Sequence, residues 1–191
     1  GNCIIEKSTN TLILGCAKTN ISNTVTSIGF GAFSGCNRLT SIKIPSSVTR
    51  IESSSFSGCS NLENITVEGG NSTYYSEGNC IIEKSTNSLI LGCARTIIPQ
   101  TVTNIGNYAF SGNENLTNIN IPNSVSDIGD YAFGGCKNLL SINIPSSVVN
   151  IGQDLFMDCV SLEEITLPSS LTRLKSRMFN GCENLRRIIS N

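Results

Sequence analysis

The strongest constraint on this chain is a motif that returns every 23 residues. One copy is nearly complete at residues 39–61 and another at 116–138, and both follow the pattern L-x-x-I-x-I-P-x-S-V-x-x-I-G-x-x-A-F-x-G-C-x-N. The same step separates the phenylalanines of the last four copies, which are Phe110, Phe133, Phe156 and Phe179. A unit this short cannot bury its own apolar side chains, so the copies must stack and share one core. The period therefore predicts a solenoid.

Each unit is expected to form one coil that is mainly β. In one L-x-x-I-x-I segment, Ile42 and Ile44 alternate with Ser41 and Lys43, which is the two-residue period of a strand with one buried face. Pro45 cannot donate to a hydrogen-bond ladder and ends that strand. The S-V-x-x-I segment predicts a second short strand. The A-F-x-G-C segment predicts one short helical turn, with its phenylalanine closing the end of the core.

Two copies of a longer coil interrupt this regular pattern. Residues 1–10 return unchanged as 78–87, and residues 12–17 return unchanged as 89–94. Both copies alternate apolar and polar residues around a Lys-Ser-Thr-Asn turn. This combination is typical of a β-hairpin with a short loop, so we expect two inserted hairpins among short parallel strands.

The whole chain, residues 1–191, is expected to form a single solenoid domain. Hairpin-bearing coils are expected near 1–20 and 70–97, with regular 23-residue coils elsewhere. The chain starts and stops inside a repeat, which predicts a piece of a longer protein. Residues 186–189 begin a coil that does not close, and an open strand edge is a template for pairing. End-to-end self-association is therefore expected at high concentration.

The repeat resembles the BspA-like subgroup of leucine-rich repeats. The resemblance covers essentially the whole chain, and it rests on L-x-x-I-x-I-P-x-S-V-x-x-I at residues 39–51 with its copies and on A-F-x-G-C at 132–136. Family members often carry an Asp-Gly-Val-Leu-Tyr-like hairpin where this chain has Asn79-Cys80-Ile81-Ile82, a departure that keeps the alternation. Such repeats occur on surface proteins of host-associated bacteria and some parasitic protists. The resemblance implies a leucine-rich-repeat solenoid, a location at the cell surface or outside the cell, and adhesion to host matrix proteins.

Composition and charge exclude several classes of function. The 13 basic and 14 acidic residues are scattered and leave a net charge of −1, so neither nucleic acid nor an anionic membrane surface is an expected partner. No apolar run reaches the ~18 residues of a membrane span, so direct membrane insertion is not expected. The chain has no His, the commonest general base and metal ligand. No nucleophile, base and orienting group can be assembled, so we expect no enzyme activity, no metal and no cofactor.

Nine cysteines pose the question of disulfides or zinc. Five share one repeat position, where another copy has Asn113, and they are Cys36, Cys59, Cys136, Cys159 and Cys182. Stacked coils would place these thiols in a parallel column about 4.8 Å apart, which suits a disulfide poorly. A column of free structural thiols is the preferred interpretation. A cross-strand disulfide within a hairpin, Cys3–Cys16 or Cys80–Cys93, is the less favoured alternative. With no C-x-x-C pair, zinc is not expected.

Two close aspartate pairs, Asp127 with Asp130 and Asp154 with Asp158, are the candidates for acid–base work. Both pairs lie in the segment that leads into the phenylalanine, where aspartate commonly accepts hydrogen bonds from backbone N–H groups. Catalysis would also need a concave pocket and pKa values that differ between the two carboxyls. Capping of backbone N–H groups is therefore preferred to catalysis.

The outward strand positions form the broadest candidate binding surface, because solenoids generally bind through such extended faces. They are Ser41, Lys43, Asn64, Thr66, Asn118, Asn120, Ser141, Asn143, Glu164, Thr166 and Arg187. This face is polar and nearly free of aromatic residues, whereas binding hot spots favour Trp, Tyr and Arg. A second candidate is the irregular loop at 68–75, whose adjacent Tyr74 and Tyr75 suit a contact surface. Packing of one tyrosine over the hairpin is the alternative interpretation.

These features favour a recognition or adhesion module of the cell surface, whose polar face binds a protein or glycan ligand on a host or matrix surface. A structural stalk that displays another domain and binds nothing is the alternative from a different class. Four Asn-x-Ser/Thr sequons, at Asn20, Asn64, Asn71 and Asn115, matter only if the source secretes through a glycosylating pathway.

Overall fold

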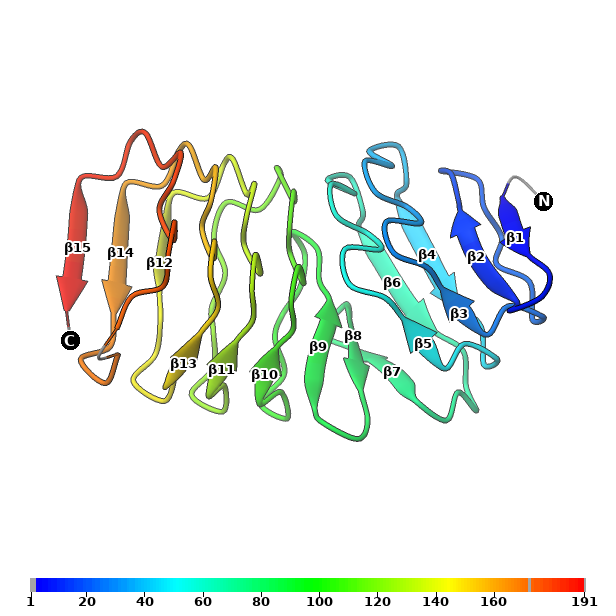
Figure 1. Ribbon diagram of the computed structural model, residues 1–191. Helices are drawn as coiled ribbons and strands as arrows, with labels where there is room; N and C mark the ends of the chain where they lie inside the picture. The colour runs from blue at the N-terminus through cyan, green and yellow to red at the C-terminus, as the bar shows by residue number, and fades with distance from the viewer. Residues whose placement is uncertain (1–2, 172, 191) are drawn as a thin grey trace.

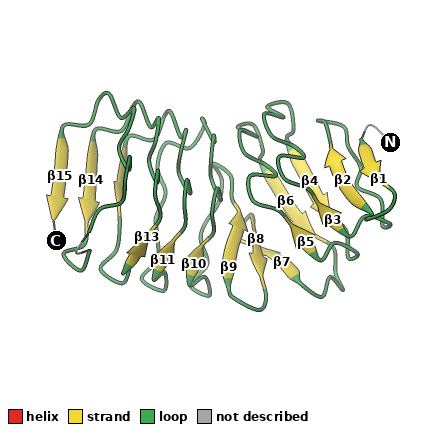
Figure 2. Cartoon of the chain, viewed as in Figure 1, coloured by secondary structure: helices red, strands yellow, loops and turns green. Residues whose placement is uncertain are grey.

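The computed structural model of the chain describes residues 3–171 and 173–190. Within this range it has 15 strands and no helix. The coils stack in sequence order, from β1 (Ile4–Glu6) at one end to β15 (Arg187–Ser190) at the other (Figure 1). Turns and loops connect the strands throughout (Figure 2). The solenoid predicted from the 23-residue period is confirmed.

Each regular coil supplies a longer strand, a shorter strand, or both. The longer strands come from the L-x-x-I-x-I segments and are β4 (Ser41–Ile44), β6 (Asn64–Val67), β12 (Ser141–Asn143), β14 (Glu164–Leu167) and β15. The shorter strands are β3 (Ser27–Ile28), β5 (Arg50–Ile51), β10 (Asn104–Ile105), β11 (Asp127–Ile128) and β13 (Asn150–Ile151). Ile42 of β4 pairs in parallel with Ile65 of β6, and Ile165 of β14 with Ile188 of β15. The sequence period is therefore the register of the sheets.

Alternation along the strands separates core from surface. In β4, Ile42 and Ile44 are buried while Ser41 and Lys43 are exposed. The buried side chains form two clusters, one in the N-terminal coils and one in the C-terminal coils. Both clusters include residues of the second hairpin, whose first strand β8 (Cys80–Glu83) is almost entirely buried. The hairpin therefore lies as a partition between the two parts of the core.

The A-F-x-G-C segment is not the helical turn that the sequence predicted. In the Phe133 coil, Tyr131 and Gly135 have φ angles of 55° and 73°, and left-handed residues cannot continue a right-handed helix. The N–H groups also bond in two directions. Gly134 N donates to the Tyr131 oxygen of its own coil at 3.0 Å, whereas Phe133 N donates to the Leu155 oxygen of the next coil at 3.1 Å. This tight segment, which we name the Phe turn, thus forms a hydrogen-bonded ladder with its neighbours.

The phenylalanines of the Phe turns stack on one another. The rings of Phe33 and Phe56 lie 5.0 Å apart at an interplanar angle of 6°. Those of Phe110, Phe133, Phe156 and Phe179 follow at 5.3, 5.7 and 6.0 Å. Each such aromatic pair is worth about 0.5–1.5 kcal/mol beyond the burial of its area. The ladder stabilises one edge of the solenoid and is broken only where the second hairpin lies, among the rings described.

Each hairpin takes the place of a short strand and of a Phe turn. β1 pairs antiparallel with β2 (Thr11–Leu14), and β8 with β9 (Ser88–Leu91), while β7 (Tyr74–Glu77) leads into the second hairpin and pairs with β8. β2 then pairs in parallel with β3, and β9 with β10. Gly15 and Gly92 follow the hairpins, and a Cβ at Gly92 would lie 2.1 Å from the Phe110 ring. Glycine is required there because the next phenylalanine covers the backbone.

The second hairpin also divides both sheets. The longer strands form two separate sheets, β4–β6 and β12–β14–β15. The shorter strands and the hairpins also form two sheets, one that ends at β5 and one that begins at β7. Residues 116–121, where the sequence predicted a strand through Asn118 and Asn120, form none. At the Phe turns, however, the coils on either side of the hairpin meet directly, because Gly58 N donates to the Ser111 oxygen at 2.9 Å. The hairpin coil thus contributes strands to the sheets but no Phe turn to the edge that the Phe turns form, which we call the Phe edge.

Replacing Gly92 by Ala tests the close approach of the backbone to Phe110. The added methyl group would overlap the ring, and overpacking of this kind typically costs about 1–3 kcal/mol. We expect a lower free energy of unfolding by denaturant titration. Gly69→Ala is the matched control, because a Cβ at Gly69 meets nothing within 4 Å. Equal stabilities of the two variants would contradict this account of the hairpin end.

Candidate functional site

The outward positions of the longer strands lie at the surface. Most of the predicted residues are exposed, and Glu164 and Thr166 are half-buried. The second hairpin separates them into two groups. The N-terminal group consists of Ser41, Lys43, Asn64 and Thr66, and the C-terminal group of Asn118, Asn120, Ser141, Asn143, Glu164, Thr166 and Arg187. We call the whole set the polar face.

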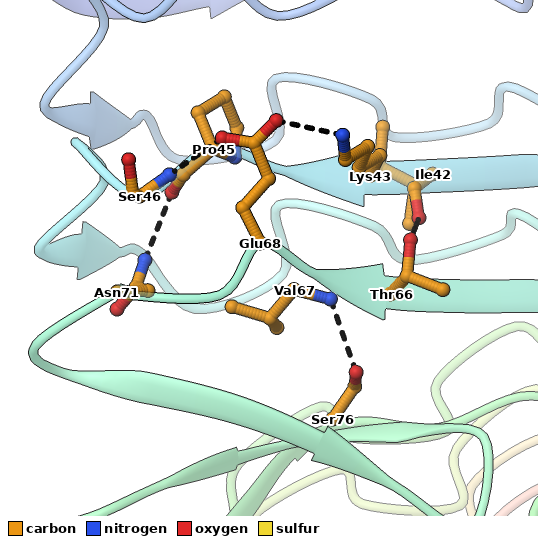
Figure 3. Close-up of polar contacts among 9 residues, drawn as sticks. All are labelled: Ile42, Lys43, Pro45, Ser46, Thr66, Val67, Glu68, Asn71 and Ser76. Atoms are coloured by element: carbon orange, nitrogen blue, oxygen red, sulfur yellow. Dashed lines mark hydrogen bonds and ion pairs between the residues drawn. The ribbon is translucent and has the colours of Figure 1, made fainter.

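The N-terminal group is tied to its own scaffold (Figure 3). Lys43 Nζ lies 2.7 Å from Glu68 Oε1, and Ser46 N donates to Glu68 Oε2 at 3.2 Å. The hydrogen bond from Lys43, followed by that from the Ser46 backbone, lowers the pKa of Glu68. Thr66 Oγ1 donates to the Ile42 oxygen at 3.4 Å. Two of the four predicted residues are therefore occupied by contacts between neighbouring coils.

The C-terminal group keeps more of its hydrogen-bonding capacity for solvent. Arg187 donates to Glu164 Oε2 at 2.5 Å, so this pair is satisfied internally. Within the described residues, by contrast, the side chains of Asn120, Ser141 and Asn143 make no hydrogen bond, and Asn118 bonds only the neighbouring Thr117 hydroxyl at 3.3 Å. This row of uncommitted amide and hydroxyl groups stays a candidate binding surface.

Asn71 is a buried anchor at the start of the second hairpin. Its Nδ2 donates to the oxygens of Pro45 and Val48, each at 2.9 Å, and its Oδ1 accepts from Thr73 N and Tyr74 N at 2.9 and 2.7 Å (Figure 3 shows the contact with Pro45). These four bonds join the coil of Pro45 and Val48 to the segment that leads into the second hairpin. Asn71 is therefore closed to glycosylation in the folded chain, whereas the sequon residues Asn20, Asn64 and Asn115 are exposed.

The backbone N–H groups of β6 find side-chain acceptors in the segment that follows Asn71. Val67 N donates to Ser76 Oγ at 3.1 Å (Figure 3), and Ile65 N donates to Asn79 Oδ1 at 2.9 Å. These side-chain acceptors replace the backbone partners that a parallel strand would supply. The sequence motif did not reveal this substitution, because both acceptors lie outside the 23-residue unit.

The two candidate tyrosines have different environments. Tyr74 is buried, and its hydroxyl accepts a hydrogen bond from Ile51 N at 3.0 Å. Tyr75 is half-buried, packs against the core and has its hydroxyl 3.5 Å from Thr101 Oγ1. Packing of one tyrosine over the hairpin, the alternative interpretation, is therefore correct for Tyr74. Only Tyr75 remains a candidate for contact with a ligand.

The predicted column of cysteines is present. All nine cysteines are free thiols, including Cys3, Cys16, Cys80 and Cys93, so neither hairpin contains a disulfide. In the column, each Sγ donates to a carbonyl oxygen of the preceding coil, as in Cys59 to Phe33 at 3.2 Å and Cys159 to Phe133 at 3.1 Å. Burial raises the pKa of both thiols to about 12. They therefore remain protonated donors at neutral pH and serve the scaffold.

Asn113 occupies the column position in the coil that follows the second hairpin. It is buried, and its Oδ1 has no hydrogen-bond partner among the described residues. Cys59, Cys136, Cys159 and Cys182 lie on a preceding Phe turn, whereas Cys36 and Asn113 each follow a hairpin coil, and Cys36 Sγ donates to the Gly15 oxygen at 3.6 Å. The exception to the cysteine pattern thus coincides with the break in the phenylalanine ladder.

Among the described residues, Asp130 is the one of the four aspartates that accepts from a backbone N–H, since its Oδ1 accepts from Gln153 N at 2.8 Å, whereas the Asp158 side chain makes no hydrogen bond. Asp127 bonds the side chains of Ser126 and Asn150. Asp154 is buried, has a φ angle of 54° and pairs with Arg177 at 2.9 Å. Capping was therefore the wrong prediction for Asp127 and Asp154, whose carboxylates bond the side chains of Asn150 and Arg177 in the next coil. Within residues 3–171 and 173–190 no three potential ligands gather to hold a metal ion.

Comparison with known proteins agrees with the repeat geometry. The family described as BspA type leucine-rich repeat region matches residues 13–87 and 91–191 in six copies. A leucine-rich cell surface protein from Faecalibacterium prausnitzii shares 32% identity with a TM-score of 0.63, over 89% of this chain and 52% of that protein. A leucine-rich repeat protein from Eubacterium ventriosum shares 30% identity with a TM-score of 0.68, over 87% of this chain and 52% of that protein. This chain therefore spans about half the length of these two proteins.

A more distant likeness shows the fold alone. The T. pallidum leucine-rich repeat protein is 24% identical with a TM-score of 0.54, over 98% of this chain and 81% of that protein. No curated protein matches the chain in sequence.

Tyr74→Phe tests whether the tyrosine is a structural residue. Without the hydroxyl, the Ile51 N–H loses its acceptor, and an unsatisfied buried group costs about 1–3 kcal/mol. We expect that loss in denaturant unfolding. Tyr75→Phe, whose hydroxyl lies at the surface, should change stability by less than about 0.5 kcal/mol. A larger effect at position 75 than at 74 would reverse the assignment.

Two cysteines at equivalent hairpin positions should react differently. Hydrogen bonds from the Lys18 backbone and the Thr19 side chain lower the pKa of Cys16, whereas burial raises that of Cys93. Because the thiolate is the nucleophile, iodoacetamide at neutral pH should alkylate Cys16 well before Cys93 in the native protein. Peptide mapping by mass spectrometry measures the two rates. In the unfolded chain the rates should converge, and equal rates in the native chain would contradict the structure.

Proposed function

The chain belongs to the BspA-type leucine-rich repeat family, and we propose that it is a cell-surface adhesion module that binds a protein or glycan ligand of a host or matrix surface. The proposed contact surface is the polar face. The observation that carries the proposal is the row of exposed, uncommitted side chains at Asn118, Asn120, Ser141 and Asn143.

The geometry of this row suits repeated weak contacts. Residues 116–121 form no strand, but β12 pairs in parallel with β14, so Ser141 and Asn143 are followed about 4.8 Å away by the outward side chains of Glu164 and Thr166. Amides and hydroxyls both donate and accept hydrogen bonds, which suits the hydroxyl groups of a glycan or the backbone of an extended peptide. Weak contacts gain overall affinity when several are made at once. Such hydrogen bonds do not require a charged surface, which agrees with the balanced charge of the chain.

The proposed location is the cell surface or the space outside the cell. The similar protein from Faecalibacterium prausnitzii is described as a cell surface protein, which supports this location. The described part of the chain contains no helix of the length and apolarity that crosses a membrane. We also propose that the chain acts by binding and without catalysis, cofactor or metal, and that nucleic acid is not its partner.

A stalk that displays another domain is the second candidate. It is favoured by the N-terminal group of the polar face, where Lys43 and Thr66 are used between coils, and by the near absence of aromatic side chains from the face. A stalk requires a stiff stack and no ligand, so the two proposals differ in whether the C-terminal group binds.

Binding of the immobilised chain to a panel of matrix proteins and glycans at physiological salt separates these proposals. We expect saturable binding to at least one member of the panel. The variant with Asn118→Ala, Asn120→Ala, Ser141→Ala and Asn143→Ala should lose at least roughly tenfold in affinity, since each lost hydrogen bond is worth about 0.5–1.5 kcal/mol. Ser41→Ala with Asn64→Ala is the matched control on the other half of the face. Absence of binding up to high micromolar concentration would leave the stalk.

A further inference from the structure

A cleft opens where the ladder of phenylalanines is broken. Phe56 is the last ring before the second hairpin and Phe110 the first after it, and the hairpin coil supplies no ring between them. Gly92 stands where a Phe turn would begin and lies against the Phe110 ring. The edge formed by the Phe turns therefore has no ring from the hairpin coil, although the hairpin strands are present in the sheets.

The cleft has a volume of about 140 Å³ and lies between the two coils that flank the hairpin. Ile51 and Phe56 line it from the N-terminal side. Ile90 and Leu91 of β9, together with Tyr108, line it from the C-terminal side. Its floor and walls are thus apolar and aromatic. A buried apolar cavity of about 150 Å³ lined by such side chains binds benzene, so this cleft has room for one aromatic ring.

The rim of the cleft is polar and carries little net charge. Ser53 and Asn107 are exposed, and both lie among the residues around the cleft. The Glu52 carboxylate is paired with Arg50 at 2.6 Å. Asn107 Oδ1 already accepts from Asp130 N at 2.8 Å, so the Ser53 hydroxyl and Asn107 Nδ2 are the rim groups that suit the backbone of a peptide, and the paired carboxylate gives no preference for a charged ligand.

Ser54 explains why the chain does not fill the cleft itself. Tyr108 and Tyr131 occupy the position of Ser54 in later coils, and their rings stack at 5.2 Å and 7°. All three residues have positive φ, at 55°, 60° and 55° for Ser54, Tyr108 and Tyr131. A tyrosine at this position would continue the stack, but serine leaves the side of Tyr108 away from Tyr131 open to the cleft.

We propose that this cleft binds one aromatic side chain of a partner protein, which enters between the coils and packs against Tyr108 and Phe56. The ring takes the place beside Tyr108 that Ser54 leaves open at the end of the tyrosine stack. The occupant is a side chain rather than a larger ligand, because the cleft holds a single ring and opens onto a rim of peptide-binding groups. The site is independent of the polar face and of the ligand proposed for it.

Binding of small model compounds tests the site directly. The ¹⁵N-labelled protein is titrated with N-acetyl-L-phenylalaninamide while the backbone amide signals are followed by NMR. We expect shifts at residues 53–56 and 106–108, and an affinity at least roughly tenfold higher than for N-acetyl-L-alaninamide, because the side chain is buried. N-acetyl-L-cyclohexylalaninamide, of similar size but without aromatic character, should bind roughly two- to tenfold more weakly than the phenylalanine compound.

Ser54→Tyr is the decisive variant, since it places the chain's own ring in the cleft. It should abolish the shifts caused by the phenylalanine compound without lowering Tm. Gly31→Tyr is the matched control, because Gly31 holds the same repeat position with a φ of 63° and a Cβ there meets only ordinary contacts. It should retain binding. Ile90→Asn, which makes the half-buried floor polar, should weaken binding even if Ser54→Tyr proves unstable.

Three outcomes would overturn the proposal. Equal shifts with the alanine and phenylalanine compounds would show that no ring is bound. Shifts that persist in both Ser54→Tyr and Ile90→Asn would place the ring elsewhere. Binding of free toluene without binding of the phenylalanine compound would assign the cleft to a small aromatic molecule. None of these results depends on whether the polar face binds glycans or matrix proteins.

Discussion

Each coil of this protein depends on the next for its backbone hydrogen bonds. In the Phe turn, alternate N–H groups point out of their own coil and donate to the following one, as Phe133 N does to the Leu155 oxygen. A buried N–H without an acceptor is costly, so neighbouring coils must stay in step along their whole length. The 23-residue period, the parallel register of the strands and the stacking of the phenylalanines follow from this single requirement.

The same requirement gives the buried polar side chains their roles. The column of thiols supplies a second donor to carbonyl oxygens of the preceding turn, as Cys59 does to the Phe33 oxygen, which also accepts from Cys36 N. Asn71 satisfies four backbone groups where the regular path is left, and Tyr74 supplies the acceptor that Ile51 N loses when the short strands part. Residues that would suggest a redox site, a glycan site or a contact surface in isolation are thus parts of the scaffold.

The second hairpin interrupts the regular stack because it adds strands on the sheet side and has no Phe turn on the opposite edge. It fills the core with β8, divides both sheets and removes one aromatic layer from the Phe edge. The polar face is thereby separated into two groups, and the C-terminal group keeps the longer row of side chains open to solvent. The cleft beside Tyr108 arises from the same mismatch. Both surfaces proposed for binding therefore depend on an interruption of the repeat, and the regular coils hold them in place.

The sequence alone determined the solenoid, the coil length, the buried and exposed sides of the strands and the presence of two hairpins, because all of these are expressed in the spacing of residues near one another in the chain. It did not determine the conformation of the Phe turn, since the left-handed residues at Ser54, Tyr108 and Tyr131 include none with a strong preference for that region. Nor did it show that Tyr74 is buried or that Asp154 is paired with Arg177, because those partners lie one coil away. Only the tertiary structure decided what happens around the second hairpin. There Gly58 contacts Ser111 directly, although the hairpin coil lies between them in the sequence, and a contact that skips a repeat leaves no trace in the period of the repeat.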